Sequence, residues 1–204
     1  MIFENRIDAA QHLISGLEKF QGENVVVLAI PRGGVPLGYV IAKYFKWPLS
    51  ILLTKKIGHP MNKEYAIGAV SLETVVLDPG NREVPDSYIK SETQNIRKLL
   101  QERYHRFLGN KPPINIKGKT VVIVDDGIAT GYTMQASIEM LKNKGTNKIV
   151  VAVPVASPRI IGSFKNQVDE LIVLETPDEF MGVGQFYVDF SEVTDDDVVK
   201  YLND

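Results

Sequence analysis

The chain has 204 residues, of which 44% are hydrophobic and 24% charged, which is enough to bury one sizeable core. Its formal charge of −2 combines 23 basic and 25 acidic side chains, so no net field attracts nucleic acid or an anionic membrane. The absence of cysteine excludes disulfides, thiolate metal sites and a cysteine nucleophile. We expect a single cytoplasmic domain over 1–204, because no apolar run approaches the roughly 20 residues that span a bilayer and no signal-peptide pattern opens the chain.

Short runs rich in β-branched residues alternate with stretches of helical periodicity along the chain. Apolar residues at helical spacing predict a first helix between Ile7 and Leu17. The runs predicted as strands are residues 25–30, 49–54, 120–124, 148–153 and 171–174. This alternation predicts an α/β fold with a Rossmann-like parallel sheet and helices on both of its faces.

Helix signals follow in order after the first strand. Pro36 suits the first turn of a helix, and Asp86 is expected to cap a long helix that runs to residue 108. A further helix is predicted over 133–144, and Thr194 with Asp197 has the spacing of a capping box for a last helix. Residues 55–68, 78–85 and 176–190 are expected to be long loops, which in a compact domain are functional or disordered.

Two acidic residues, Asp125 and Asp126, follow the predicted strand 120–124, at the end of a sheet where ligands bind. The turn after them offers backbone N–H groups, the hydroxyls of Thr130 and Thr133 and a helix N-terminus, all suited to a phosphate. Adjacent carboxylates would repel a phosphate but suit the cis-diol of a ribose, or a Mg²⁺ ion held through its hydroxyls. The sequence therefore predicts a sugar-phosphate ligand.

The segment from Val121 to Thr133 resembles, position for position, the motif with which type I phosphoribosyltransferases bind 5-phosphoribosyl 1-pyrophosphate (PRPP). The resemblance implies the fold of that family, with a core over about 22–174 and a small hood from 1–21 and 175–204. It implies that Asp125 and Asp126 bind the ribose hydroxyls and, directly or indirectly, the Mg²⁺ cofactor. The residues implied to hold the 5-phosphate are Ala129, Thr130, Gly131, Tyr132 and Thr133. Hypoxanthine-guanine enzymes carry an aspartate where Ala129 stands, so their mechanism is not expected here.

A short loop follows the first predicted strand and falls at the same sheet edge as the acidic pair. It contains Arg32, Gly33 and Gly34. Taken alone they fit an ordinary turn equally well. The resemblance implies a pyrophosphate-binding loop with a cis peptide in or next to Arg32, which is expected to act with Asp125 and Asp126 in catalysis. Lys55 and Lys56 follow the next strand and are expected to neutralise the departing pyrophosphate. Residues 59–68 stand where the family carries a mobile loop that closes over PRPP.

Aromatic residues cluster in the segment expected to form the hood. Phe186 and Tyr187 suit either stacking on a flat base or a small satellite core. Asp189 would accept hydrogen bonds from a base if it points inward, and would only cap the loop if it points outward.

The reaction implied by the resemblance is displacement of pyrophosphate from C1 of PRPP by a ring nitrogen of a purine-like base, as in nucleotide salvage, in a protein that could form a homodimer. One alternative is a PRPP-binding sensor with little catalysis, which predicts a basic face. The residues available for such a face are Arg97, Lys98, Arg103 and Arg106. A PRPP-synthesising kinase is disfavoured, because those enzymes resemble two such domains in tandem.

Overall fold

The computed structural model describes residues 1–78, 80 and 83–204, without the side chain of Glu64. Five parallel strands form the main sheet in the order β2-β1-β6-β7-β8. Their bounds are β1 (Val25–Ala29), β2 (Leu49–Ile51), β6 (Thr120–Val124), β7 (Lys148–Val155) and β8 (Glu170–Glu175). The predicted parallel sheet is confirmed.

Helices cover both faces of this sheet because alternate strand residues point to opposite sides. Val25 and Val27 of β1 pack with α1 (Arg6–Leu17) and α2 (Gly34–Phe45). Val26 and Leu28 pack with α4 (Tyr132–Lys142) and α5 (Pro158–Phe164) on the other face. Both β1 and β6 are buried throughout, which explains why they read as unbroken apolar runs. Two short 3₁₀ helices complete the elements of this part, η1 (Glu18–Phe20) and η2 (Val183–Phe186).

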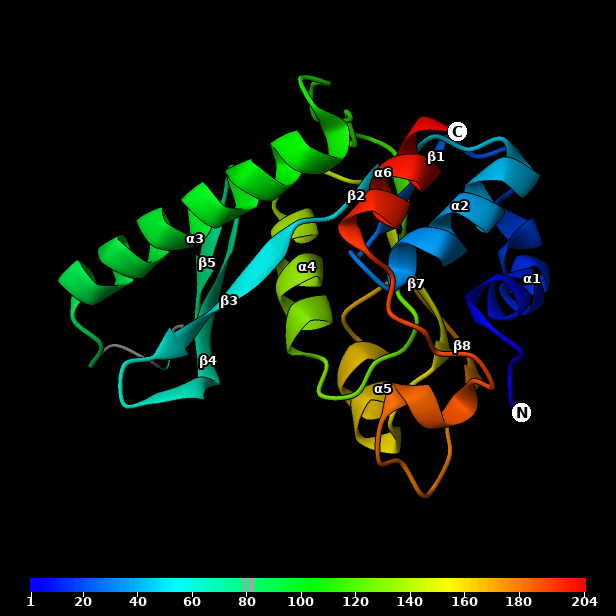
Figure 1. The fold of residues 1–204 in the computed structure, drawn as a ribbon. Coiled ribbons are helices and arrows are strands. Elements are labelled where there is room, and N and C mark those ends of the chain that lie inside the picture. The colour runs from blue at the N-terminus through cyan, green and yellow to red at the C-terminus, as the bar shows by residue number, and fades with distance from the viewer. Residues whose placement is uncertain (79, 81–82) are drawn as a thin grey trace.

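A second, antiparallel sheet projects to one side of the main sheet (Figure 1). It consists of β3 (Thr54–His59), β4 (Asn62–Ser71) and β5 (Val75–Leu77), in that order, and packs against the long helix α3 (Asp86–Leu108). The expectation of a loop over 55–68 is therefore wrong. Buried Ile57 and Ile67 meet Leu100 of α3 in a shared core, so packing against a distant helix stabilises a hairpin whose own sequence is polar and interrupted.

Several predicted boundaries shift for local reasons. The predicted strand 49–54 divides between two sheets, since β2 ends at Ile51 and β3 begins at Thr54. Asp86 does not cap α3: Pro85 stands at the N-cap without a side-chain bond, and Asp86 lies in the first turn, where a negative charge also favours the helix dipole. The expected loop 78–85 lies partly outside the described residues. Within the described part of the chain, no helix is both long and apolar enough to cross a membrane.

The last helix, α6 (Asp195–Asn203), begins with the predicted capping box. Thr194 accepts from the backbone N–H of Asp197, and the Asp197 carboxylate accepts from the Thr194 backbone. We expect Thr194→Ala to lower the free energy of unfolding by about 1 kcal/mol, measured by urea titration. Thr194→Ser keeps the hydroxyl and should unfold like the wild type. An unchanged midpoint for Thr194→Ala would show that the packing of α6 on α2 and α3 holds this helix without its cap.

Candidate functional site

The strand order of the main sheet reverses direction between β1 and β6. The chain moves outward to β2 on one side of β1, and to β7 and β8 on the far side of β6. The helices that follow these two strands, α2 and α4, therefore lie on opposite faces of the sheet. Such a switch point is where open α/β sheets bind ligands. The loops that leave the carboxyl ends of the two strands start side by side, because the Ile30 backbone N–H donates to the Val124 carbonyl over 2.9 Å.

Glycines bring the two loops into direct contact. A Cβ atom added to Gly33 would stand 2.0 Å from Oδ2 of Asp126, and one added to Gly34 would stand 2.4 Å from the carbonyl oxygen of Val124. Only a residue without a side chain allows this approach. The peptide bond between Pro31 and Arg32 is cis, where the resemblance placed one. The structure thus brings the predicted pyrophosphate loop and the acidic pair together.

The two carboxyl groups of the acidic pair have different surroundings. Asp125 accepts a hydrogen bond from the Asp126 backbone N–H over 2.9 Å. Burial raises the pKa of Asp125, and the neighbouring charge of Asp126 raises it further. Burial also raises the pKa of Asp126, but the guanidinium of Arg6 opposes that effect, with Nε and Nη2 each 2.9 Å from Oδ2. Asp126 is consequently the carboxyl better kept as an anion.

The raised pKa of Asp125 predicts a gain in stability when its charge is removed. A buried acid of this kind binds its proton more tightly in the folded than in the unfolded chain, so the free energy of unfolding falls as pH rises from 3.8 through the raised value. We expect Asp125→Asn to have a larger free energy of unfolding than the wild type at neutral pH and to match it below the unfolded pKa. Urea titrations at several pH values, with the exposed Asp178→Asn as control, measure this. A constant difference across pH would contradict the prediction.

The predicted phosphate loop leads directly into α4. Gly131 takes a left-handed conformation with φ of 75° and precedes the helix without any side-chain cap. Ala129, Thr130, Tyr132 and Thr133 are exposed around it. Ser157 Oγ donates to the Ala129 carbonyl over 3.0 Å, and this hydrogen bond fixes the loop to the start of α5. The first N–H groups of the helix and two hydroxyls are therefore available for an anion.

The predicted cations lie at different places around this loop. Lys56 Nζ is 5.5 Å from the ring centroid of Tyr132, so the antiparallel sheet brings it to the phosphate loop. Lys55 is exposed in a cleft that Lys63 also lines. Arg32 Nη2 contacts Glu192 closely, and its Nη1 lies 3.6 Å from Asp195. The Arg32 guanidinium is thus held by the acidic start of α6.

The hood segments of the sequence analysis meet as a small parallel bridge. The Phe3 backbone N–H donates to the Phe186 carbonyl, and that of Val188 donates to the Phe3 carbonyl, each over 2.8 Å. Phe186 and Tyr187 are only 9% and 6% exposed, so neither ring offers a free face, and their contact with a base stays a prediction. Exposed Asp189 accepts from the backbone and hydroxyl of the neighbouring Ser191 and caps its own loop. The division into core and hood likewise stays a prediction.

Two contacts of the acidic pair had no signal in the sequence. Tyr187 donates its hydroxyl to the Asp126 carbonyl over 2.7 Å, and burial raises its pKa. Arg6 reaches Asp126 from the start of α1, 120 residues away in the chain. Tyr187 is predicted above only as an aromatic residue for a base or a small core, and Arg6 reads as a polar position beside a helix cap. Only the pairing of the N-terminal and C-terminal segments beside the main sheet brings them to the site.

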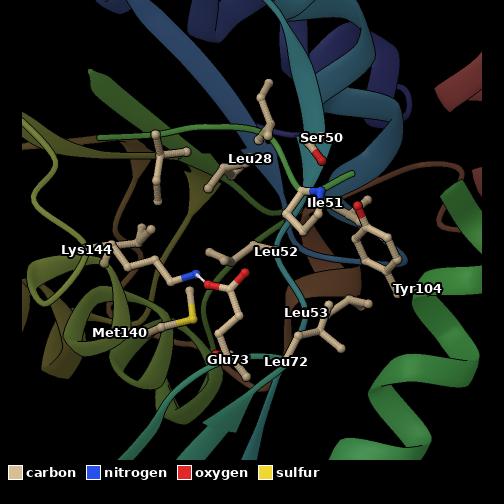
Figure 2. A pocket seen from close by; sticks show the side chains of 15 residues that line it. Leu28, Ser50, Ile51, Leu52, Leu53, Leu72, Glu73, Tyr104, Met140 and Lys144 are labelled. Atoms are coloured by element: carbon tan, nitrogen blue, oxygen red, sulfur yellow. Dashed lines mark hydrogen bonds and ion pairs between the residues drawn. The ribbon is translucent and has the colours of Figure 1, made fainter. Parts of the chain in front are cut away.

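A separate cavity of about 70 Å³ lies between the two sheets (Figure 2). Leu28, Leu52 and Met140 are among its mainly apolar lining residues, and an ion pair of 2.6 Å between Lys144 and Glu73 spans one side. The acidic pair does not line it. Its wall lacks the helix N-terminus and the threonine hydroxyls that the switch point offers, so the cavity is a packing gap between the two sheets rather than part of the candidate site.

Comparison with known proteins identifies the family of the chain. Residues 2–190 match the family model described as the phosphoribosyl transferase domain. A provisionally named phosphoribosyl transferase of Mycobacterium tuberculosis is 35% identical over 99% of the chain, which spans 46% of that relative. The crystal structure of TT1426 from Thermus thermophilus is similar with a TM-score of 0.92 and 39% identity, covering 99% of this chain and 98% of that one. A ribose-phosphate pyrophosphokinase of Pyrococcus furiosus is 43% identical over 45% of the chain and 37% of its own length. The chain therefore belongs to the phosphoribosyl transferase family.

Proposed function

We propose that this protein transfers the phosphoribosyl group of PRPP, bound with Mg²⁺, to a ring nitrogen of a purine-like base and releases pyrophosphate. One observation carries the proposal: Gly33 lies against the carboxylate of Asp126 at the switch point of the sheet. This contact joins a loop suited to pyrophosphate to a carboxylate pair suited to a ribose. A ligand that carries both groups on adjacent atoms fits the junction.

The sugar phosphate would occupy the loop between β6 and α4. Asp125 and Asp126 would accept hydrogen bonds from the two ribose hydroxyls. The N–H groups around Gly131, with the hydroxyls of Thr130 and Thr133, would hold the 5-phosphate at the positive end of α4. These contacts anchor both ends of the ribose and fix the orientation of C1.

Pyrophosphate would lie along Gly33 and Gly34, whose backbone is open to close approach. Arg32 would exchange the carboxylates of Glu192 and Asp195 for the phosphate oxygens, and Lys56, with Lys55 behind it, would add positive charge beside Tyr132. The C1–O bond to pyrophosphate breaks as the bond from the ring nitrogen forms, and the departing group gains negative charge. Cations near that group stabilise the charge as it develops.

The donor set at the acidic pair fits a Mg²⁺ ion that is held mainly by substrate and water. Among the described residues, no group of three or more His, Cys, Asp or Glu side chains is placed to hold a metal. Two carboxylates beside a diol and a pyrophosphate suit this hard ion, which keeps much of its water shell. When bound, Mg²⁺ would neutralise pyrophosphate and strengthen it as a leaving group. Asp125 and Asp126 would orient the ribose and balance the positive charge that develops on it.

The alternative of a nucleic-acid-binding sensor loses part of its basis in the structure. The expected basic face lies on α3, where Arg106 pairs with Asp195 at 2.7 Å and with Asp196 at 3.5 Å. Arg97 donates to the backbone carbonyl of Glu73. Internal contacts therefore use two of the four cations that such a face would need. Assembly as a homodimer and a cytoplasmic location stay predictions.

The proposed function is tested by calorimetric titration of the wild-type protein with PRPP and Mg²⁺, followed by a screen of purine and other nitrogen bases for pyrophosphate release. Binding together with base-dependent release is expected. Binding without release under any base would favour the sensor. Absence of binding at millimolar PRPP in a folded sample would overturn the assignment.

A further inference from the structure

The side chain of Arg6 connects three segments that are far apart in the sequence. Its Nε and Nη2 atoms each lie 2.9 Å from Oδ2 of Asp126, and Nη1 donates to the Ser191 carbonyl over 2.8 Å. The guanidinium carbon lies 4.0 Å from the centroid of the Phe190 ring. Because the Arg6 side chain is only 11% exposed and that of Asp126 15%, this ion pair is largely shielded from water.

Both nitrogen atoms contact the same carboxylate oxygen. Gly33 packs against the same carboxylate, since a Cβ added there would lie 2.0 Å from Oδ2 and 3.0 Å from Oδ1 of Asp126. Oδ1 makes no hydrogen bond to any other residue that the structure describes. These contacts use Oδ2 as an anchor and leave the hydrogen-bonding capacity of Oδ1 unused.

We propose that Arg6 is a positioning residue for the sugar site, which fixes the carboxylate of Asp126 so that Oδ1 meets a ribose hydroxyl. This inference rests on the proposed function. Arg6 also ties Asp126 to residues 190–191, so the C-terminal segment and the sugar site are held in one geometry.

An arginine is needed for this role because its planar fork presents several donors in fixed directions. A lysine would keep the charge but could not direct two donors at Oδ2 and a third at Ser191. Loss of the fork would let the Asp126 carboxylate rotate. The substitution Arg6→Lys therefore separates the effect of the positive charge from the effect of the guanidinium geometry.

The test compares Arg6→Lys with the wild type by titration of PRPP and Mg²⁺. We expect Kd for PRPP to rise about tenfold, with kcat at saturating PRPP within about twofold of the wild type. Arg159→Lys, an exposed arginine on α5, is the matched control and should change neither value. Thermal unfolding of each variant shows that it is folded. Wild-type affinity in folded Arg6→Lys would overturn the inference.

A double-mutant cycle separates action through Asp126 from direct contact with the ligand. Arg6→Gln is combined with Asp126→Asn. The double variant removes both charges of the ion pair, so neither is left buried without a partner. If Arg6 acts through Asp126, Arg6→Gln weakens PRPP binding strongly in the wild-type background and by less than about twofold when residue 126 is already asparagine. Equal losses in both backgrounds would contradict it. Failure of the wild type itself to bind PRPP would instead reject the proposed function.

Discussion

Changing Asp125 and Asp126 together to alanine is expected to weaken the binding of PRPP with Mg²⁺ by at least about 100-fold. Hydrogen bonds to charged groups contribute about 1.5–3 kcal/mol each, so losing two carboxylate acceptors costs roughly 3 kcal/mol or more, which corresponds to that factor. Calorimetric titration measures the loss directly. Pyrophosphate release should fall at least as far, because the same carboxylates orient C1 of the sugar.

The control for this change is the exposed pair Asp178→Ala with Glu179→Ala, two neighbouring acids in the loop after β8. It removes the same number of charges away from the switch point and should leave PRPP affinity unchanged. The double change of Asp125 and Asp126 to alanine also leaves Arg6 without its partner carboxylate. A second variant, Asp125→Asn with Asp126→Asn, removes both charges but keeps side chains of similar shape. Wild-type affinity in either folded variant of the acidic pair would mean that the ribose binds elsewhere.

Gly34→Ala is expected to destabilise the fold by about 2–4 kcal/mol and to abolish pyrophosphate release. The new Cβ would lie 2.4 Å from the Val124 carbonyl oxygen and 2.9 Å from the Asp125 Cα. Both are backbone atoms of a central strand and its loop, so they cannot move aside as the end of a flexible side chain could. The two loops of the site would have to separate. Urea titration and the release assay measure the two effects.

Gly162→Ala provides the matched control for that substitution. Gly162 also lies in a helix, α5, but a Cβ added there meets no atom within 4 Å. Alanine should therefore stabilise the protein by about 0.5–1 kcal/mol, as expected for a helix interior. If Gly34→Ala also proved neutral or stabilising, the close approach of the two loops would not be a feature of the protein in solution.

The parallel sheet and the positions of the acidic pair could be predicted from the sequence alone. β1 and β6 are buried on both faces, so their unbroken apolar runs identify them without any tertiary information. Asp125, Asp126 and the turn to Gly131 are consecutive in the chain, so the prediction of a phosphate cradle needs only the local geometry at a strand end. The position of the cis peptide at Arg32 was also available from the resemblance of a short segment.

The residues that surround the acidic pair could not be predicted in this way. The hairpin of β3 and β4 owes its stability to α3, so its own polar sequence gave the appearance of a loop. Arg6 and Tyr187 reach Asp126 across 120 and 61 residues, and such contacts leave no period or spacing to recognise. The aromatic cluster around Phe186 fitted a base-stacking site and a small core equally well, and burial of this side chain is visible only in the fold. Local patterns reflect the backbone geometry of one segment, whereas these features depend on which surfaces meet when the chain has folded.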